Sequence, residues 1–150
     1  MRMETERLYL YPVSNDEMSC LIEKEADAEM KQAYTEMLEG CLMEPDNRIW
    51  YAVWNMELKN VPGTIVGDFC FKGLGKDGVV EIGYGLRKEF RHQGYMVETV
   101  KVITECLCFF MRNLVGLLAE CYDKHFAIFI LIKNSHLFTY NRTIRTKKAS

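Results

Sequence analysis

The sequence predicts an α/β domain organised around one β-α-β unit. Residues 79–84 form an apolar run that suits a strand, and Gly83 and Gly85 interrupt it. From Met96 to about residue 113, apolar side chains recur at three- and four-residue spacing, which is typical of an amphipathic helix. A further strand-like run follows at residues 115–122, so a strand, a helix and a strand follow one another in the chain.

Length, composition and charge set limits on this domain. The chain has 150 residues, of which 49% are hydrophobic and 27% charged, so we expect one folded domain over residues 1–150. Residues 1–48 hold 5 Lys and Arg against 12 Asp and Glu, whereas the remainder holds 14 against 9. An acidic first part would attract a cationic acceptor and a basic remainder suits a polyphosphate, although solvated helix faces explain the same pattern. No nucleic-acid partner is expected.

The start of the chain and its cysteines predict a reducing compartment. Acidic residues stand where a secretory signal needs an apolar core, so we expect a cytoplasmic location. The six cysteines are then expected to be reduced thiols. Cys106 and Cys108 would point to different faces of the predicted helix, which argues against a metal site. The longest apolar run, residues 126–132, is too short to span a bilayer, so no membrane partner is expected.

The first third of the chain predicts a strand and two helices. Residues 7–13 alternate in polarity and suit an opening strand with Pro12 near its end. Residues 16–25 and 28–42 are rich in Glu, Met, Leu and Ala, so they are expected to form helices that end before Pro45.

A hairpin is expected next, from aromatic and β-branched runs at residues 49–56 and 64–71. The link that follows, residues 73–78, matches the dinucleotide-binding pattern G-x-G-x-x-G. A dinucleotide loop must follow a strand and open a helix, yet strand sequence continues on the far side of this link. We therefore predict a plain hairpin turn there.

The segment that joins the central strand to its helix carries the main functional signal, and it reads Arg91, His92, Gln93, Gly94, Tyr95, Met96. The first amides of a helix have no internal acceptor, and the helix dipole places roughly half a positive charge there. Gly94 lets the backbone approach a ligand and Arg91 adds a cation, so this segment predicts a pyrophosphate cradle. An ordinary glycine-bearing loop is the alternative.

Residues 91–96 resemble the acetyl-coenzyme A signature of the GNAT N-acetyltransferases, Arg/Gln-x-x-Gly-x-Gly/Ala, and residues 81–84 resemble the strand before it. The opening residues 4–12, ETERLYLYP, are similar to the start of the RimJ/RimL-like branch, the ribosomal-protein N-terminal acetyltransferases. With Glu98 after the signature, the resemblance covers about residues 4–124. It implies a mixed, mostly antiparallel twisted sheet flanked by helices, two of which help wall the acceptor site. It also implies contacts with acetyl-coenzyme A from Leu86, Arg87, Arg91, His92, Gln93, Gly94, Tyr95, Met96 and His125.

The resemblance places the catalytic base at Glu81, which would take the proton of the amine through water. The alternative is a solvated strand carboxylate paired with a neighbouring Lys or Arg. Glu120 and Asp123 are second choices for the base. A main-chain amide at residues 84–86 is expected to stabilise the oxyanion. Relatives use a Tyr or Ser from a late helix as general acid, and Tyr84 and Tyr122 are the candidates here.

The last quarter of the chain departs from the family and predicts a divergent carboxy-terminal end. Relatives have an amphipathic helix announced by Asn-x-Ala/Pro-Ser, whereas the matching positions hold His125, Ala127 and Ile128, and the local composition favours a strand. Residues 137–146 supply one closing strand where relatives have a hairpin. The resulting open edge and exposed apolar surface predict a homodimer that buries residues 126–132.

The activity expected from these features is transfer of an acetyl group from acetyl-coenzyme A to a primary amine within a ternary complex. The amine would belong to a protein N-terminus or to a small molecule. The alternative is a catalytically weakened domain that binds coenzyme A or a protein partner without turnover, because Met96 replaces a small residue and Ile128 replaces the family's Ser.

Overall fold

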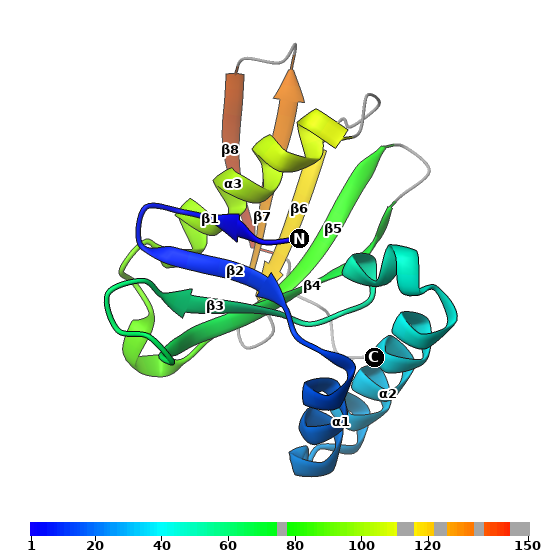
Figure 1. Cartoon of the computed structure of the whole chain (residues 1–150). Coiled ribbons are helices and arrows are strands. Elements are labelled where there is room, and N and C mark those ends of the chain that lie inside the picture. Colours follow the sequence, from blue (N-terminus) through cyan, green and yellow to red (C-terminus); the bar gives the residue numbers. More distant parts are fainter. Residues whose placement is uncertain (75–77, 111–115, 122–125, 134–136, 145–150) are drawn as a thin grey trace.

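The computed structural model describes residues 1–74, 78–110, 116–121, 126–133 and 137–144 (Figure 1). Its strands and helices, in chain order, are β1 (Met3–Glu4), β2 (Leu8–Pro12), α1 (Asn15–Lys24), α2 (Ala28–Met43), the 3₁₀ helix η1 (Pro45–Trp50), β3 (Trp54–Leu58), β4 (Ile65–Leu74), β5 (Val79–Leu86), the 3₁₀ helix η2 (Lys88–Phe90), α3 (Tyr95–Phe110), β6 (Gly116–Cys121), β7 (Phe126–Lys133) and β8 (Leu137–Ile144).

The strands form one sheet whose order across the sheet is their order in the sequence. Neighbouring strands are antiparallel except β5 and β6, which are parallel because the chain crosses between them through α3. The predicted mixed, mostly antiparallel sheet with a central β-α-β unit is confirmed. Figure 1 shows α3 lying across the sheet, whereas α1 and α2 pack together at one end of it, apart from α3.

Both early helices begin and end within one residue of the predicted positions. Ser14 caps α1 in a reciprocal pair: its hydroxyl accepts the Glu17 amide, and its own amide donates to the Glu17 carboxylate. Asp27 caps α2 by accepting the Met30 amide at 2.9 Å. These caps satisfy orphan amides that would otherwise compete with the helical conformation.

The strand predicted at residues 49–56 is wrong in its first half. Pro45 opens the 3₁₀ helix η1, which continues through Trp50, and β3 begins only at Trp54. The indole nitrogen of Trp54 donates to the carbonyl of Ile49 at 2.9 Å, which holds η1 against the strand. The aromatic and β-branched composition of this stretch therefore reflects burial rather than extended backbone.

The β4–β5 hairpin shows whether the glycine-rich pattern at residues 73–78 opens a helix. The two strands run antiparallel on either side of residues 75–77, which lie outside the described residues, so the G-x-G-x-x-G match does not open a helix and the hairpin is confirmed. At the other end of the pair the backbones approach closely. A Cβ on Gly67 would lie 2.2 Å from the carbonyl oxygen of Gly85, which only glycine avoids.

The core lies between α3 and the face of the sheet that it covers. On β5 the side chains of Val80, Ile82 and Tyr84 are buried, and they belong to the same cluster as Val100 and Ile103 of α3. Alternate residues of β5 therefore face away from α3. Each fully buried side chain of this size contributes about 1.5–3 kcal/mol to folding, so this face is the main source of stability.

The last described strands confirm the strand character that the local composition predicts. Phe126–Lys133 is a strand, β7, rather than the family's helix, and β8 matches the strand predicted at 137–146. β7 pairs with β6 on one side and with β8 on the other. The edge strand on this side is β8.

The described part of the chain bears on the expectations for membrane helices, metal-binding groups and disulfides. No helix there is long and apolar enough to cross a membrane. No group of three or more His, Cys, Asp or Glu side chains among those residues could hold a metal ion, and no disulfide joins Cys20, Cys41, Cys70, Cys106 and Cys108.

Candidate active site

The loop before α3 has an unusual backbone. His92 and Gly94 both adopt left-handed conformations, with φ of 61° and 84°. Glycine takes this conformation freely, but a residue with a Cβ pays about 1–2 kcal/mol for it. Left-handed residues alternating with ordinary ones turn successive amides toward a common point, which is the geometry of an anion nest. The strain at His92 marks the loop as a candidate site.

Main-chain amides of this loop and of the first turn of α3 are available to a ligand. Among the described residues, no amide from His92 to Val97 donates to a protein acceptor, and the first helical bond runs from the Glu98 amide to the Gly94 carbonyl at 3.2 Å. A 16-residue helix adds the positive end of its dipole to these amides. The arrangement can hold a doubly charged phosphate or diphosphate group.

The side chains predicted to bind the cofactor divide into two groups. His92, Gln93 and Gly94 are exposed, whereas Tyr95 and Met96 are buried in the core and can offer only their amides. Because the Met96 side chain points into the core, it does not crowd the helix start.

Arg91, Leu86 and Arg87 lie where β5 ends. Arg91 is half-buried, and its Nε donates to the Leu86 carbonyl at 3.0 Å, which ties the loop to the strand. Among the described residues, the parallel pairing of β5 with β6 runs from Val79 to Tyr84, and Gly85 and Leu86 complete β5. Arg87 is exposed, and its amide donates to the Val66 carbonyl at 2.8 Å. The end of β5 therefore leads directly into the amide-rich loop.

A brace that the sequence did not reveal holds this loop in place. Arg7, in the turn before β2, donates from Nε to the Glu98 carboxylate and from Nη2 to the Gln93 carbonyl at 2.8 Å. Its guanidinium lies 4.2 Å from the centroid of the Tyr95 ring. Thr5 donates to the other Glu98 oxygen at 2.5 Å. Arg7 and Glu98 both stand in the resembling motifs, but their separation of 91 residues hides the pairing in the sequence.

The brace also fixes the charge of Glu98. Burial opposes ionisation of this carboxyl, but the hydrogen bonds from Thr5 and Arg7 outweigh burial and lower its pKa. Glu98 therefore has a structural role: it accepts hydrogen bonds from Thr5 and Arg7 at the start of α3, close to the predicted anion cradle.

The predicted catalytic residues occupy quite different surroundings. Glu81 is half-exposed on β5, and Lys72 Nζ lies 3.4 Å from its Oε1, which is the ion pair named above as the alternative to a base. Tyr84 is only 6% exposed and belongs to the core. Tyr122, Asp123 and His125 lie outside the described residues. Glu120 is described only through its backbone, which pairs with Gly83 and Ala127.

Asp68 of β4 is a further candidate that the sequence analysis missed. It lies directly across from Gly85 in the ladder, and burial raises the pKa of its carboxyl to about 6 in spite of the nearby Arg87 charge. In the described part of the chain, this half-buried carboxylate accepts no hydrogen bond. A sequence signal existed: Asp68 is the one charged residue in the otherwise apolar run IVGDFCF.

Tyr34 of α2 shares this environment. Its ring packs against a small apolar cluster of Val13, Met18 and Val53 that attaches the two early helices to the sheet. Burial, followed by the charges of Asp68 and Glu25, raises the pKa of the Tyr34 phenol to about 12. Tyr34 and Asp68 are thus two half-buried polar groups, one on a helix and one on a strand. Asp68 lies across the ladder from Gly85, near the end of β5.

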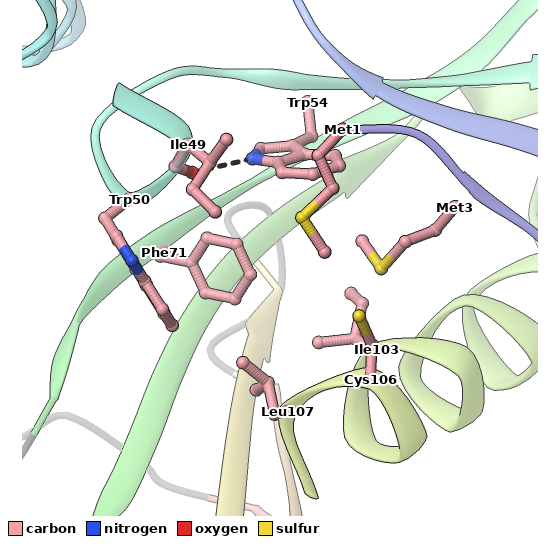
Figure 2. A pocket seen from close by; sticks show the side chains of 9 residues that line it. All are labelled: Met1, Met3, Ile49, Trp50, Trp54, Phe71, Ile103, Cys106 and Leu107. Atoms are coloured by element: carbon pink, nitrogen blue, oxygen red, sulfur yellow. Dashed lines mark hydrogen bonds between the residues drawn. The ribbon is translucent and has the colours of Figure 1, made fainter. Parts of the chain in front are cut away.

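A cavity of about 190 Å³ lies elsewhere, beside the second half of α3 (Figure 2). Figure 2 shows Trp50, Trp54 and Phe71 on one side of it and Ile103 and Leu107 on the other. Its remaining lining is also apolar or sulfur-bearing, so nothing in it could hold a diphosphate. The cavity is separate from the amide-rich loop at the other end of α3.

Residues 5–135 match the family model of the acetyltransferase (GNAT) domain, so the chain belongs to the GNAT acetyltransferase family. A comparison with curated proteins gave no match. Among solved structures, RimL, a ribosomal L7/L12 alpha-N-protein acetyltransferase in complex with coenzyme A, is 13% identical with a TM-score of 0.58, covering 95% of this chain and 94% of that one.

Two other acetyltransferases have the same fold. The Salmonella typhimurium enzyme that modifies the N-terminal serine of L7/L12 is 11% identical with a TM-score of 0.57, covering 79% of this chain and 74% of its own. The ribosomal-protein-S5-alanine acetyltransferase of Vibrio fischeri is 14% identical with a TM-score of 0.55, covering 79% of this chain and 73% of its own. At these identities the likeness shows the fold, and the predicted family resemblance is confirmed by the family match.

The raised pKa of Asp68 makes a prediction about stability. Because the folded state binds this proton more tightly than the unfolded chain, the stabilisation is complete below pH 4 and is lost as the pH rises through about 6. Two pKa units correspond to about 3 kcal/mol, and partial exposure reduces this figure. We expect Asp68→Asn to raise the free energy of unfolding by about 1–2 kcal/mol at pH 8 and to change it little at pH 4.

Urea unfolding of both proteins at the two pH values measures this difference. Asp46→Asn, at an exposed aspartate in η1, is the matched control and should not reproduce it. A variant that is equally destabilised at both pH values would contradict the assignment.

Proposed function

We propose that the protein transfers the acetyl group of acetyl-coenzyme A to a primary amine by direct attack within a ternary complex. The observation that carries this proposal is the run of main-chain amides from residue 92 to residue 97, at the start of α3, which bond to no acceptor within the described residues. Family membership supports an acetyltransferase, and the likeness to a coenzyme A complex supports the cofactor. The amides fit the diphosphate because they supply many donors without a bulky side chain.

Several residues would hold acetyl-coenzyme A. The amides of the loop and the Arg91 side chain would bind the diphosphate, with the exposed His92 and Gln93 beside it. Leu86 and Arg87 would border the pantetheine, because the Leu86 carbonyl accepts from Arg91 of this loop. His125 stays a predicted contact. The bound thioester supplies an activated acetyl group.

Proton movement is assigned to side chains near the same strand. Glu81 would accept the proton of the ammonium through water, and an amide at residues 84–86 would stabilise the oxyanion. Tyr84 or Tyr122 would return a proton to the departing thiolate. Of these groups, Glu81 has the solvent access that a base acting through water needs.

The names of two structural neighbours support an acceptor class. One is named for modifying the N-terminal serine of L7/L12 and the other as a ribosomal-protein-S5-alanine acetyltransferase, which supports a protein N-terminus; a small-molecule amine would suit the same chemistry. A cytoplasmic location stays a prediction.

A second candidate is a domain that binds coenzyme A without turnover. The burial of Tyr84 in the core favours it, because a buried hydroxyl is badly placed to serve a thiolate. Release of free thiol from acetyl-coenzyme A in the presence of a mixed panel of amines discriminates the two: amine-dependent release supports the enzyme, and binding without release supports the second candidate.

Arg91→Ala tests the cradle. Losing one charge-assisted contact to the diphosphate should weaken coenzyme A binding by about 1.5–3 kcal/mol, measured by calorimetric titration. Lys88→Ala, which removes a cation from the adjacent η2, is the matched control and should bind nearly as well as wild type. Equal affinity of Arg91→Ala and wild type would place the cofactor elsewhere.

Glu81→Gln tests the base. The variant keeps the shape but cannot take the proton, so turnover should fall on the order of a hundredfold while coenzyme A binding survives. Lys72→Gln breaks the same ion pair and leaves the carboxylate in place, so it should retain most activity. If both variants lose activity equally, the ion pair matters rather than a base.

The homodimer that buries residues 126–132 stays a proposal, and the edge strand β8 offers a test of it. β8 pairs with β7 alone among the described strands, so a two-fold mate could extend the sheet along Leu137–Ile144. Light scattering should give a dimer mass at micromolar concentration, and the double variant Thr139→Lys, Thr143→Lys should be monomeric, because lysines on an edge strand oppose pairing. A monomeric wild type would refute the dimer.

A further inference from the structure

Asp68 lies on the face of the sheet opposite α3. Its neighbours in the strand, Phe69 and Phe71, are buried in the α3-side core, so Asp68 and Cys70 face the other way. Directly across the ladder stand Gly85 and Gly83 of β5. Because neither glycine has a side chain, β5 leaves space beside the Asp68 carboxylate.

The charges around this carboxylate leave it uncompensated. No Lys or Arg among the described residues forms an ion pair with Asp68, and Arg87 acts on it only from a greater distance. Tyr34 of α2 packs against the apolar cluster that contains Val53, the residue before β3, and burial, followed by the charges of Asp68 and Glu25, raises the pKa of its phenol. The Tyr34 hydroxyl donates no hydrogen bond within the described part of the chain, so it too is available to a ligand. The surroundings contain acidic groups and one distant cation.

A half-buried carboxylate without hydrogen bonds is expensive to ionise, and a cation that arrives beside it removes that cost. A primary ammonium group provides a positive charge and three donors, which match one carboxylate and one hydroxyl oxygen. We propose that Asp68 and Tyr34 bind the ammonium group of the acceptor amine. This inference rests on the acetyl transfer proposed above.

The position of Asp68 suits this role. Gly85, its partner across the ladder, immediately precedes Leu86 and Arg87, where we place the pantetheine. Gly67, next to Asp68, allows the close approach of β4 to this end of β5, since a Cβ there would lie 2.2 Å from the Gly85 carbonyl oxygen. The two glycines thus bring the ammonium site within a strand's width of the proposed thioester position. Asp68 is a binding residue here, whereas Glu81 takes the proton.

Equilibrium binding tests the proposal without requiring turnover. A short peptide that begins with serine is titrated into the coenzyme A-loaded protein by calorimetry, in parallel with its N-acetylated form and with 1,4-diaminobutane. We expect the free amine to bind and the acetylated peptide not to bind. A preference for the peptide over the diamine would identify a protein N-terminus as the source of the ammonium, and the reverse would identify a small molecule.

Asp68→Asn should weaken amine binding about 10- to 100-fold at pH 7.5, as expected for a lost charge-assisted hydrogen bond, without changing the affinity for coenzyme A. Tyr34→Phe should weaken it by a smaller factor. Glu25→Gln removes an equal charge from the same region without touching Asp68, so it is the matched control and should bind nearly normally. Wild-type binding should also strengthen as the pH rises through about 6, and this dependence should vanish in Asp68→Asn.

The outcomes separate the two proposals. Equal amine affinity in Asp68→Asn and Glu25→Gln, or no amine binding by wild type, overturns the role of Asp68. Amine binding that depends on Asp68, together with no thiol release from acetyl-coenzyme A, supports the ammonium site and contradicts the acetyl transfer.

Discussion

The ion pair between Arg7 and Glu98 joins the beginning of the chain to the beginning of α3, and the candidate site depends on it. The loop at residues 91–94 contains two left-handed residues and a series of amides with no protein acceptor in the described part of the chain. Such a loop would gain by rearranging to satisfy those amides, unless surrounding contacts hold it. Arg7 supplies these contacts, to Glu98, to the Gln93 carbonyl and to the ring of Tyr95.

This dependence explains why the opening motif and the signature motif occur together in one chain. Thr5 and Arg7 lie in the short turn between β1 and β2, and that turn is fixed by the Thr5 side chain, which accepts the amides of Arg7 and Leu8. The turn between β1 and β2 therefore supports the loop that we propose as the cofactor site, although no residue of the turn needs to contact the cofactor. A preorganised loop loses little conformational entropy when it binds its anion.

The elements with a strong periodic or capping signal could be predicted from the sequence. α1, α2 and the β-α-β unit appeared where periodicity and caps placed them, and the strand character of residues 126–132 followed from composition against the family pattern. The stretch 49–56 failed, because burial and strand geometry favour the same aromatic residues and only Pro45 hinted at a 3₁₀ turn.

The site shows the same division. The loop and helix start could be predicted because their chemistry is local in sequence, within residues 91–96. The Arg7–Glu98 brace and the Asp68–Tyr34 pair join residues far apart in the chain, so only the fold brings them together. Asp68 also connects stability with the proposed function. Burial makes ionisation of this carboxyl destabilising in the folded protein, and a bound cation would remove that destabilisation.

The order of the strands has a consequence for how the chain folds. Every described strand lies next to its neighbour in sequence, and most neighbouring pairs are hairpins that close short loops. Two pairs are not: α1, α2 and η1 separate β2 from β3, and α3 separates β5 from β6, which is the parallel pair among the described strands. Two antiparallel halves, β1–β5 and β6–β8, can therefore form independently, and the slow step of folding is expected to be their joining along this parallel seam.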